Sequence, residues 1–209
     1  MTISCDILDR RFSAANTAKV SGVSQELQRD WRRREILPPW DGPGRKHFDV
    51  GEVIELFILK IWSDAGIGVA GMRPAAAWAV LQVSSILQTL PGAFTVNADE
   101  DIDQGTIDAL IHDTFRPSGK HGRYLWIAPR HADSYKNVGE LKGSFGDQTL
   151  AFARNFHCKT VESLEQLQPA FDDSRCVSMT VVDMQRIAET ILERADGPLF
   201  TAEIHRAAK

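Results

Sequence analysis

Two consecutive prolines, Pro38 and Pro39, divide the first third of the chain into two short blocks. Proline cannot donate to a helix ladder and biases the preceding residue toward extended geometry, so no helix continues through this point. The run that follows, Trp40-Asp41-Gly42-Pro43-Gly44, has the composition of a tight turn. The helices on either side of these residues must therefore end or begin here.

Two short helices are predicted before the prolines. The first covers residues 14–20 after Ser13, and the second begins at Ser24 and runs to about Arg34, because serine commonly caps a helix N-terminus. The tripeptide Ser21-Gly22-Val23 supplies the turn between them. Two short helices joined by a glycine-containing turn are typical of a helix-turn-helix.

The second helix is amphipathic and basic. Leu27 and Trp31 lie one turn apart and predict a buried side, with Trp31 in the core rather than against a base. The other sides carry three arginines: Arg29, Arg32 and Arg33. Guanidinium groups suit guanine edges and phosphate oxygens alike, so these arginines would either position the helix on DNA or read its sequence.

Beyond the turn, residues 45–48 are long enough only for a short extended segment, which predicts a small hairpin or wing. A third helix is predicted from Asp49, because apolar residues then recur at three- and four-residue spacing up to Ile61. Pro74 suits the first turn of a fourth helix over residues 75–90.

From Pro91 the sequence changes to β-branched and aromatic runs separated by polar turns. The elements predicted in this part are strands at 93–96, 124–127 and 177–182 and helices around 107–111 and over 184–194. We therefore expect a mostly α N-terminal winged helix-turn-helix with its following helix at residues 1–90, and a small α+β domain at residues 91–209.

The net charge of -4 and the pI of about 5.9 ordinarily argue against a nucleic-acid partner, because phosphate binding requires Lys and Arg. The charge is uneven, however. Residues 1–75 hold eleven Lys and Arg against ten Asp and Glu, whereas residues 76–209 hold thirteen against eighteen. One stretch of the first part is rich in cations: Arg29, Arg32, Arg33, Arg34, Arg45 and Lys46. A local basic patch therefore lies inside an acidic protein.

Residue types that commonly bind metals or perform catalysis lack the spacing that such sites need. The three cysteines, Cys5, Cys158 and Cys176, form no CxxC pair. Several histidines of the second part lie near acidic or thiol groups without a helical metal-binding spacing or a nucleophile elbow: His112-Asp113, His121, His131-Ala132-Asp133 and His157-Cys158. We expect no enzymatic activity, no catalytic residue, no metal and no cofactor.

The cellular location follows from two further features. The first eleven residues carry charges at Asp6, Asp9, Arg10 and Arg11, where a signal peptide would be continuously apolar. The longest apolar stretch, residues 75–90, is interrupted by Gln and Ser and is too short to span a bilayer. A cytoplasmic protein without membrane contact is expected.

The first third of the chain resembles the winged helix-turn-helix of MerR-type transcriptional regulators in the order and spacing of its motifs. The matching residues are Phe12-Ser13-Ala14, Gly22-Val23-Ser24, Arg29-Asp30-Trp31, Ile36-Leu37-Pro38 and Arg45-Lys46-His47-Phe48-Asp49. The chain departs from the family pattern at three positions. Gln28 stands where Leu is usual, Asp30 where an aromatic residue is usual, and Glu35 where a glycine normally ends the helix.

The resemblance implies sequence-specific binding of double-stranded DNA and a role in transcription regulation. The second helix would enter a major groove, and the wing would approach the flanking backbone. With two further polar residues of the second helix included, the candidate DNA-binding residues are Ser24, Gln25, Gln28, Arg29, Arg32, Arg33, Arg45, Lys46 and His47.

Family members usually continue from the fourth helix into a long coiled coil that forms the dimer, whereas the fourth helix here stops at Pro91. A homodimer is still expected, because helix-turn-helix proteins commonly read paired half-sites. Residues 91–209 would then serve dimerisation, the sensing of a small-molecule effector or contact with a protein partner.

Two alternative functions are open at this point. An excisionase-type accessory protein uses a similar small winged domain to bend DNA. An enzyme with its active site in residues 91–209 would use the N-terminal part only for delivery to DNA, and a cleft with perturbed His and Asp residues would favour it.

Overall fold

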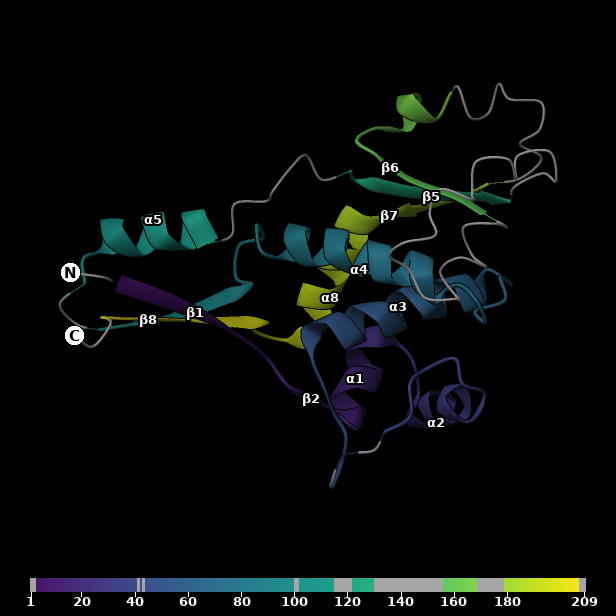
Figure 1. Ribbon diagram of the computed structural model, residues 1–209, viewed down its shortest axis with the longest axis horizontal. Helices are drawn as coiled ribbons and strands as arrows, with labels where there is room; N and C mark the ends of the chain where they lie inside the picture. The colour runs from purple at the N-terminus through teal and green to yellow at the C-terminus, as the bar shows by residue number, and fades with distance from the viewer. Residues whose placement is uncertain are drawn as a thin grey trace, which may run out of the picture.

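The structure is a computed structural model that describes residues 3–40, 42, 44–99, 102–114, 122–129, 156–168 and 179–206. Over these residues it has six α-helices and eight strands in three sheets, with about 48% helix and 23% strand. A helical body carries one sheet at its end and another on one side (Figure 1). The fold class is therefore mixed α/β, and the expectation of a mostly α N-terminal part followed by a small α+β domain is wrong.

The terminal strands explain much of that error. Strand β1 (Ile3–Asp9) pairs antiparallel with β8 (Phe200–Arg206), so that Ile3 lies opposite Arg206. Strand β4 (Phe94–Ala98) pairs in parallel with the other edge of β8. No strand was predicted at either end of the chain, because the pairing of β1 with β8 joins residues from opposite ends of the sequence.

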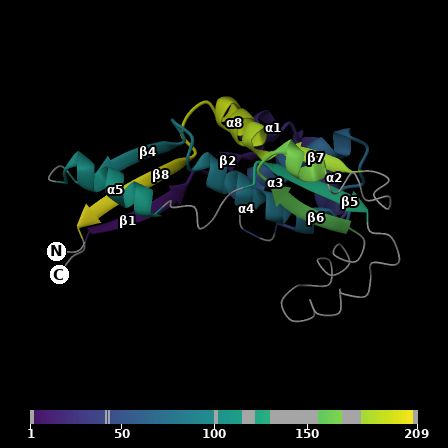
Figure 2. The same cartoon turned by 90° about the horizontal axis from the view of Figure 1, so that it is seen from above.

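Helix α5 (Gln104–Thr114) covers one face of the β1-β8-β4 sheet, as seen in Figure 2. Ile107 from the helix, Ile102 from the preceding turn and Ile204 from β8 form a small buried cluster between them. This end of the molecule has its own minor core, apart from the main one.

Two short helices occupy the positions that the serine caps predicted. Helix α1 (Ala14–Ser21) begins after Ser13, whose Oγ accepts a hydrogen bond from the Asn16 N–H at 3.2 Å. It ends at Gly22, which has a left-handed φ of 74°. That conformation suits glycine and turns the chain into helix α2 (Gln25–Arg33).

Helix α2 ends at Arg33, before the two prolines that were expected to stop it. The N–H of Glu35 donates to the carbonyl of Arg32, and the N–H of Ile36 donates to the carbonyl of Trp31, which is the Schellman pattern. Glu35 itself has a φ of 57°, a left-handed conformation that favours glycine. Backbone geometry therefore ends the helix, and Pro38 follows as a further stop.

The main core is built around helix α3 (Val50–Asp64). Its first turn is closed by a capping box, in which Asp49 Oδ1 accepts from the Glu52 N–H and Glu52 Oε2 accepts from the Asp49 N–H. Eight of its residues are buried: Val50, Val53, Ile54, Leu56, Phe57, Ile58, Leu59 and Trp62. The helix is therefore enclosed on nearly every side.

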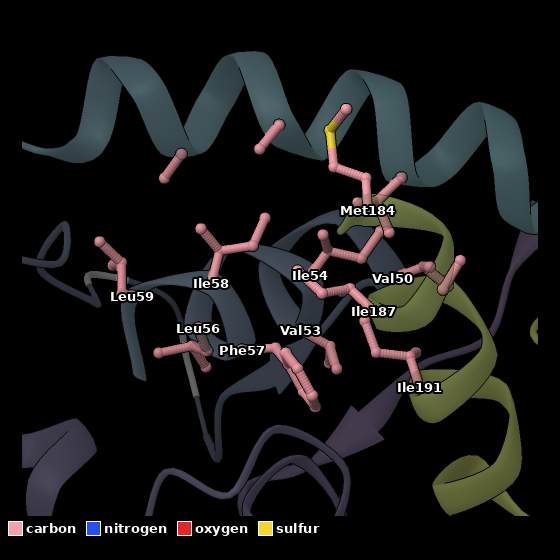
Figure 3. Close-up of a cluster of buried hydrophobic side chains, with 14 of the residues drawn as sticks. Val50, Val53, Ile54, Leu56, Phe57, Ile58, Leu59, Met184, Ile187 and Ile191 are labelled. Carbon is pink, nitrogen blue, oxygen red and sulfur yellow. The ribbon is translucent and has the colours of Figure 1, made fainter. Parts of the chain in front are cut away.

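Helix α4 (Arg73–Leu87) and helix α8 (Met184–Ala195) pack around α3. In Figure 3 the side chains of Met184, Ile187 and Ile191 from α8 meet the apolar residues of α3 beneath α4. The fourth helix ends three residues earlier than predicted, and a turn over 88–92 leads into β4.

A third sheet has the order β6-β5-β7, with β6 at Phe156–Val161, β5 at Tyr124–Pro129 and β7 at Thr180–Asp183. A short 3-10 helix, η2 (Leu164–Leu167), follows β6. Leu125 and Ile127 of β5 and Val182 of β7 join the main core. Strand β5 lies at its predicted position, 124–127. Strand β7 overlaps the predicted strand 177–182, of which residues 177–178 lie outside the described residues. Strand β6 was not predicted.

The core crosses the boundary predicted at residue 90. Helix α8, strand β5 and strand β7 contribute to the same buried cluster as α1, α3 and α4, and β1 completes a sheet with β4 and β8. The division into residues 1–90 and 91–209 remains a prediction.

In the part of the chain that the structure describes, no helix is long and apolar enough to cross a membrane.

A fragment of residues 1–90 lacks α8 and would expose the sides of α4 and α1 on which α8 packs, together with part of the apolar cluster around α3. We expect this fragment to show no cooperative unfolding transition in urea, followed by tryptophan fluorescence, whereas the full chain unfolds cooperatively. A fragment that unfolds with the same midpoint as the full chain would mean that residues 1–90 fold independently.

Replacing Glu35 by glycine removes the Cβ from a left-handed residue without disturbing the backbone hydrogen bonds of the Schellman pattern. We expect Glu35→Gly to raise the free energy of unfolding by about 1 kcal/mol. The control is Ala77→Gly in an exposed part of α4, which should lower it by about 1 kcal/mol. Urea titration measures both, and a loss of stability in both variants would contradict the strain at Glu35.

Candidate nucleic-acid interface

The wing is built by two strands that are distant in sequence. Strand β3 (His47–Phe48) pairs antiparallel with β2 (Phe12–Ser13), which lies directly before α1. Phe12 and Phe48 face each other and are both buried. The extended segment was predicted, but its partner was not, because a two-residue strand leaves no periodic pattern.

Helix α2 lies on the outside of the helical body, on the opposite side of α3 and α4 from the β5-β6-β7 sheet (Figure 1). Ser24 caps it, with Oγ accepting from the Leu27 N–H at 3.1 Å. Trp31 is only 2% exposed and belongs to the main core, and Leu27 packs against that core. The prediction that Trp31 is a core residue is confirmed.

Gln28 lies inside the protein rather than on the candidate surface. Its side chain is buried, and Nε2 donates to the carbonyl of Val23 at 2.9 Å and to the carbonyl of Ala14 at 3.3 Å. These bonds tie α2 to the turn before it and to the start of α1. Gln28 was a candidate DNA-binding residue, and this placement gives it a structural role instead.

A pocket of about 540 Å³ lies against α2. Its described lining residues, which we call the α2 face, are Ser24, Glu26, Leu27, Arg29, Asp30 and Arg33. Arg29 is exposed and has no ion-pair partner among the described residues. Gln25 is also exposed on α2. Of the predicted helix residues, the structure therefore brings Ser24, Arg29 and Arg33 together on one surface.

Arg32 lies at the junction of α2 and the wing. Its guanidinium stands over the ring of Phe48, 5.2 Å from the centroid. Partial burial lowers the pKa of Arg32, and the carboxylate of Glu52 acts in the opposite direction. An arginine remains charged at neutral pH even so, and here its charge holds two elements together.

Lys46 belongs to the same junction. Its Nζ forms an ion pair with Glu52, the residue that completes the cap of α3, and lies 4.9 Å from the centroid of the Trp40 ring. The side chain of Lys46 is only 17% exposed. Arg32 and Lys46 therefore fix the wing against α2 and α3, and little of Lys46 is left for contact with DNA.

Two wing residues remain open to solvent. Arg45 and His47 are exposed, and Arg45 has no ion-pair partner within the described ranges. His47 pairs through its backbone with Ser13 in the β2-β3 ladder. These two residues, Gln25 and the α2 face are the parts of the predicted interface that a partner could reach.

Asp30 lies on the α2 face but was not among the candidate residues. Its Oδ1 accepts from Arg33 Nη2 at 2.5 Å, and its Oδ2 lies 3.5 Å from Arg34 Nη1. The i, i+3 and i, i+4 spacing could have revealed these pairs in the sequence. The α2 face accordingly carries two carboxylates, Glu26 and Asp30, beside two guanidinium groups, Arg29 and Arg33.

Nowhere in the described part of the chain do three or more His, Cys, Asp or Glu side chains gather as metal ligands would. The histidine groups at 112–113, 121, 131–133 and 157–158 lie outside the side chains that the structure describes. Their roles stay as predicted from the sequence.

Comparison with known proteins adds no family assignment. No protein-family model matches the chain, and no curated protein matches it either. What this surface does must therefore follow from its own geometry and charge.

Removing the buried amide of Gln28 would leave the carbonyls of Val23 and Ala14 without their donor. We expect Gln28→Ala to lower the free energy of unfolding by about 1–3 kcal/mol, the usual cost of unsatisfied buried polar groups. Gln25→Ala, on the exposed side of the same helix, should change it by less than about 0.5 kcal/mol. Equal effects of the two substitutions in a urea titration would argue against the structural role of Gln28.

Proposed function

We propose that this protein binds double-stranded DNA sequence-specifically and regulates transcription. The observation that carries the proposal is the placement of α2. Its apolar side, through Leu27 and Trp31, is anchored in the core, while Arg29 and Arg33 project from the opposite side. A helix held in this way presents donors to a groove without losing its own packing.

In the proposed mode of binding, α2 enters the major groove and the wing approaches the backbone beside it. Arginine donors suit the O6 and N7 of guanine, and exposed arginines also suit phosphate oxygens. Arg29 and Arg33 would supply the first kind of contact and Arg45 the second. Arg32 and Lys46 would act by fixing the angle between the helix and the wing.

We further propose that the protein acts in the cytoplasm as a homodimer, because a single short helix reads only a few base pairs and helix-turn-helix proteins commonly bind two half-sites. The sheet formed by β1, β8 and β4 and the third sheet would supply dimerisation, effector sensing or contact with a protein partner. No catalytic activity is proposed.

The double variant Arg29→Ala/Arg33→Ala tests the proposal. We expect it to lose binding to duplex fragments enriched by the wild-type protein from genomic DNA, with a loss of at least about a hundredfold in affinity. Fluorescence anisotropy across a salt titration measures the affinity, and circular dichroism with urea titration checks that the fold is retained.

The matched control is Lys159→Ala/Arg186→Ala, which removes two exposed cations from β6 and α8, far from α2 in the chain. This variant should bind as the wild type does. If the Arg29/Arg33 variant binds as tightly as the control at every salt concentration, α2 does not contact DNA. Bending of the bound fragment without any effect on transcription from the site would instead favour an architectural protein.

A further inference from the structure

Asp30 sits in the middle of the α2 face with both carboxylate oxygens engaged. One oxygen accepts a hydrogen bond from Arg33, and the other lies within ion-pair distance of Arg34. The side chain of Asp30 is 28% exposed, whereas that of Arg33 is 81% exposed. The carboxylate therefore holds the guanidinium from beneath and leaves most of it open to solvent.

This contact restricts where Arg33 can go. A free arginine side chain samples many rotamers, and ordering it on binding costs conformational entropy. The guanidinium has five N–H donors in a fixed plane, so one bond to Asp30 leaves donors for a base edge. Arg33 is thus oriented before any ligand arrives.

The same carboxylate also weakens attraction to phosphate. On the α2 face the charges of Glu26 and Asp30 offset those of Arg29 and Arg33. Sequence-independent binding depends on uncompensated cations, because each neutralised phosphate releases counterions. A base edge, in contrast, presents both donors and acceptors, so a face with both kinds of group can match it.

We propose that Asp30 is a specificity-determining residue: it positions Arg33 to read guanine in the major groove and prevents Arg33 and Arg34 from binding the phosphate backbone at unrelated sequences. This inference rests on the proposed function of the α2 face. Asp30 is a positioning residue for Arg33, and it also carries the negative charge that opposes non-specific binding.

The test compares two duplexes for each variant: a fragment enriched by the wild-type protein from genomic DNA, and poly(dA-dT), which contains no guanine, as the unrelated sequence. The specificity ratio is the affinity for the first divided by the affinity for the second. We expect Asp30→Ala to lower this ratio about tenfold, with weaker binding to the enriched fragment and tighter binding to poly(dA-dT). The salt dependence on poly(dA-dT) should steepen by about one unit of log–log slope.

Two variants separate positioning from net charge. Glu26→Ala removes the same charge from the same face, but Glu26 has no ion pair with any described residue, so both duplexes should bind more tightly by a similar factor. Asp30→Glu keeps a carboxylate near Arg33 and should retain most of the ratio. Alanine is the best helix former, so α2 should stay folded in both alanine variants, as circular dichroism would verify.

The outcomes distinguish this inference from the proposed function. A reduced ratio in Asp30→Ala alone, restored in Asp30→Glu, supports the positioning role. Equal changes in Asp30→Ala and Glu26→Ala overturn it while leaving DNA binding intact. A wild-type protein that enriches no fragment and binds neither duplex overturns the proposed function itself.

Discussion

The burial of α3 is the interaction on which the other elements depend. No residue from 50 to 62 is exposed, and the eight buried residues of the helix are all apolar. Burying one such side chain contributes about 1.5–3 kcal/mol, whereas an exposed ion pair contributes about 0–1 kcal/mol. The apolar contacts of α3 with α1, α4 and α8 therefore hold the molecule together, and the charged residues of the surface are free to serve binding.

The candidate interface takes its rigidity from the same helix. The wing is joined to the first turn of α3 through Phe48, which is buried, and through the bond from Lys46 to the capping residue Glu52. Helix α2 is joined to the core by Trp31 and to α1 by the amide of Gln28. Recognition requires side chains on elements whose positions are already fixed, and these four contacts supply that condition.

Short-range patterns in the sequence predicted the helices of the first third of the chain. The serine caps located α1 and α2, and the apolar spacing located α3, because a helix is specified by residues three and four positions apart. The strands β1 and β8 and the β2-β3 pair were missed, since their partners lie far along the chain and carry no short-range signal. In the candidate site the exposed arginines were predicted, whereas the burial of Gln28 was not, because its side chain is polar. The one sign that position 28 faces inward was the Leu that is usual there in the MerR-type pattern.

The net negative charge of the whole chain does not describe the charge of the candidate interface. Residues 76–209 carry all of the excess negative charge, and the α2 face itself is balanced. A protein with this distribution gains little from the phosphate backbone, which supplies most non-specific affinity. If α2 binds DNA, most of the free energy of binding must come from base contacts and from the pairing of two protomers. The acidic residues on the α2 face therefore favour selective binding over tight binding.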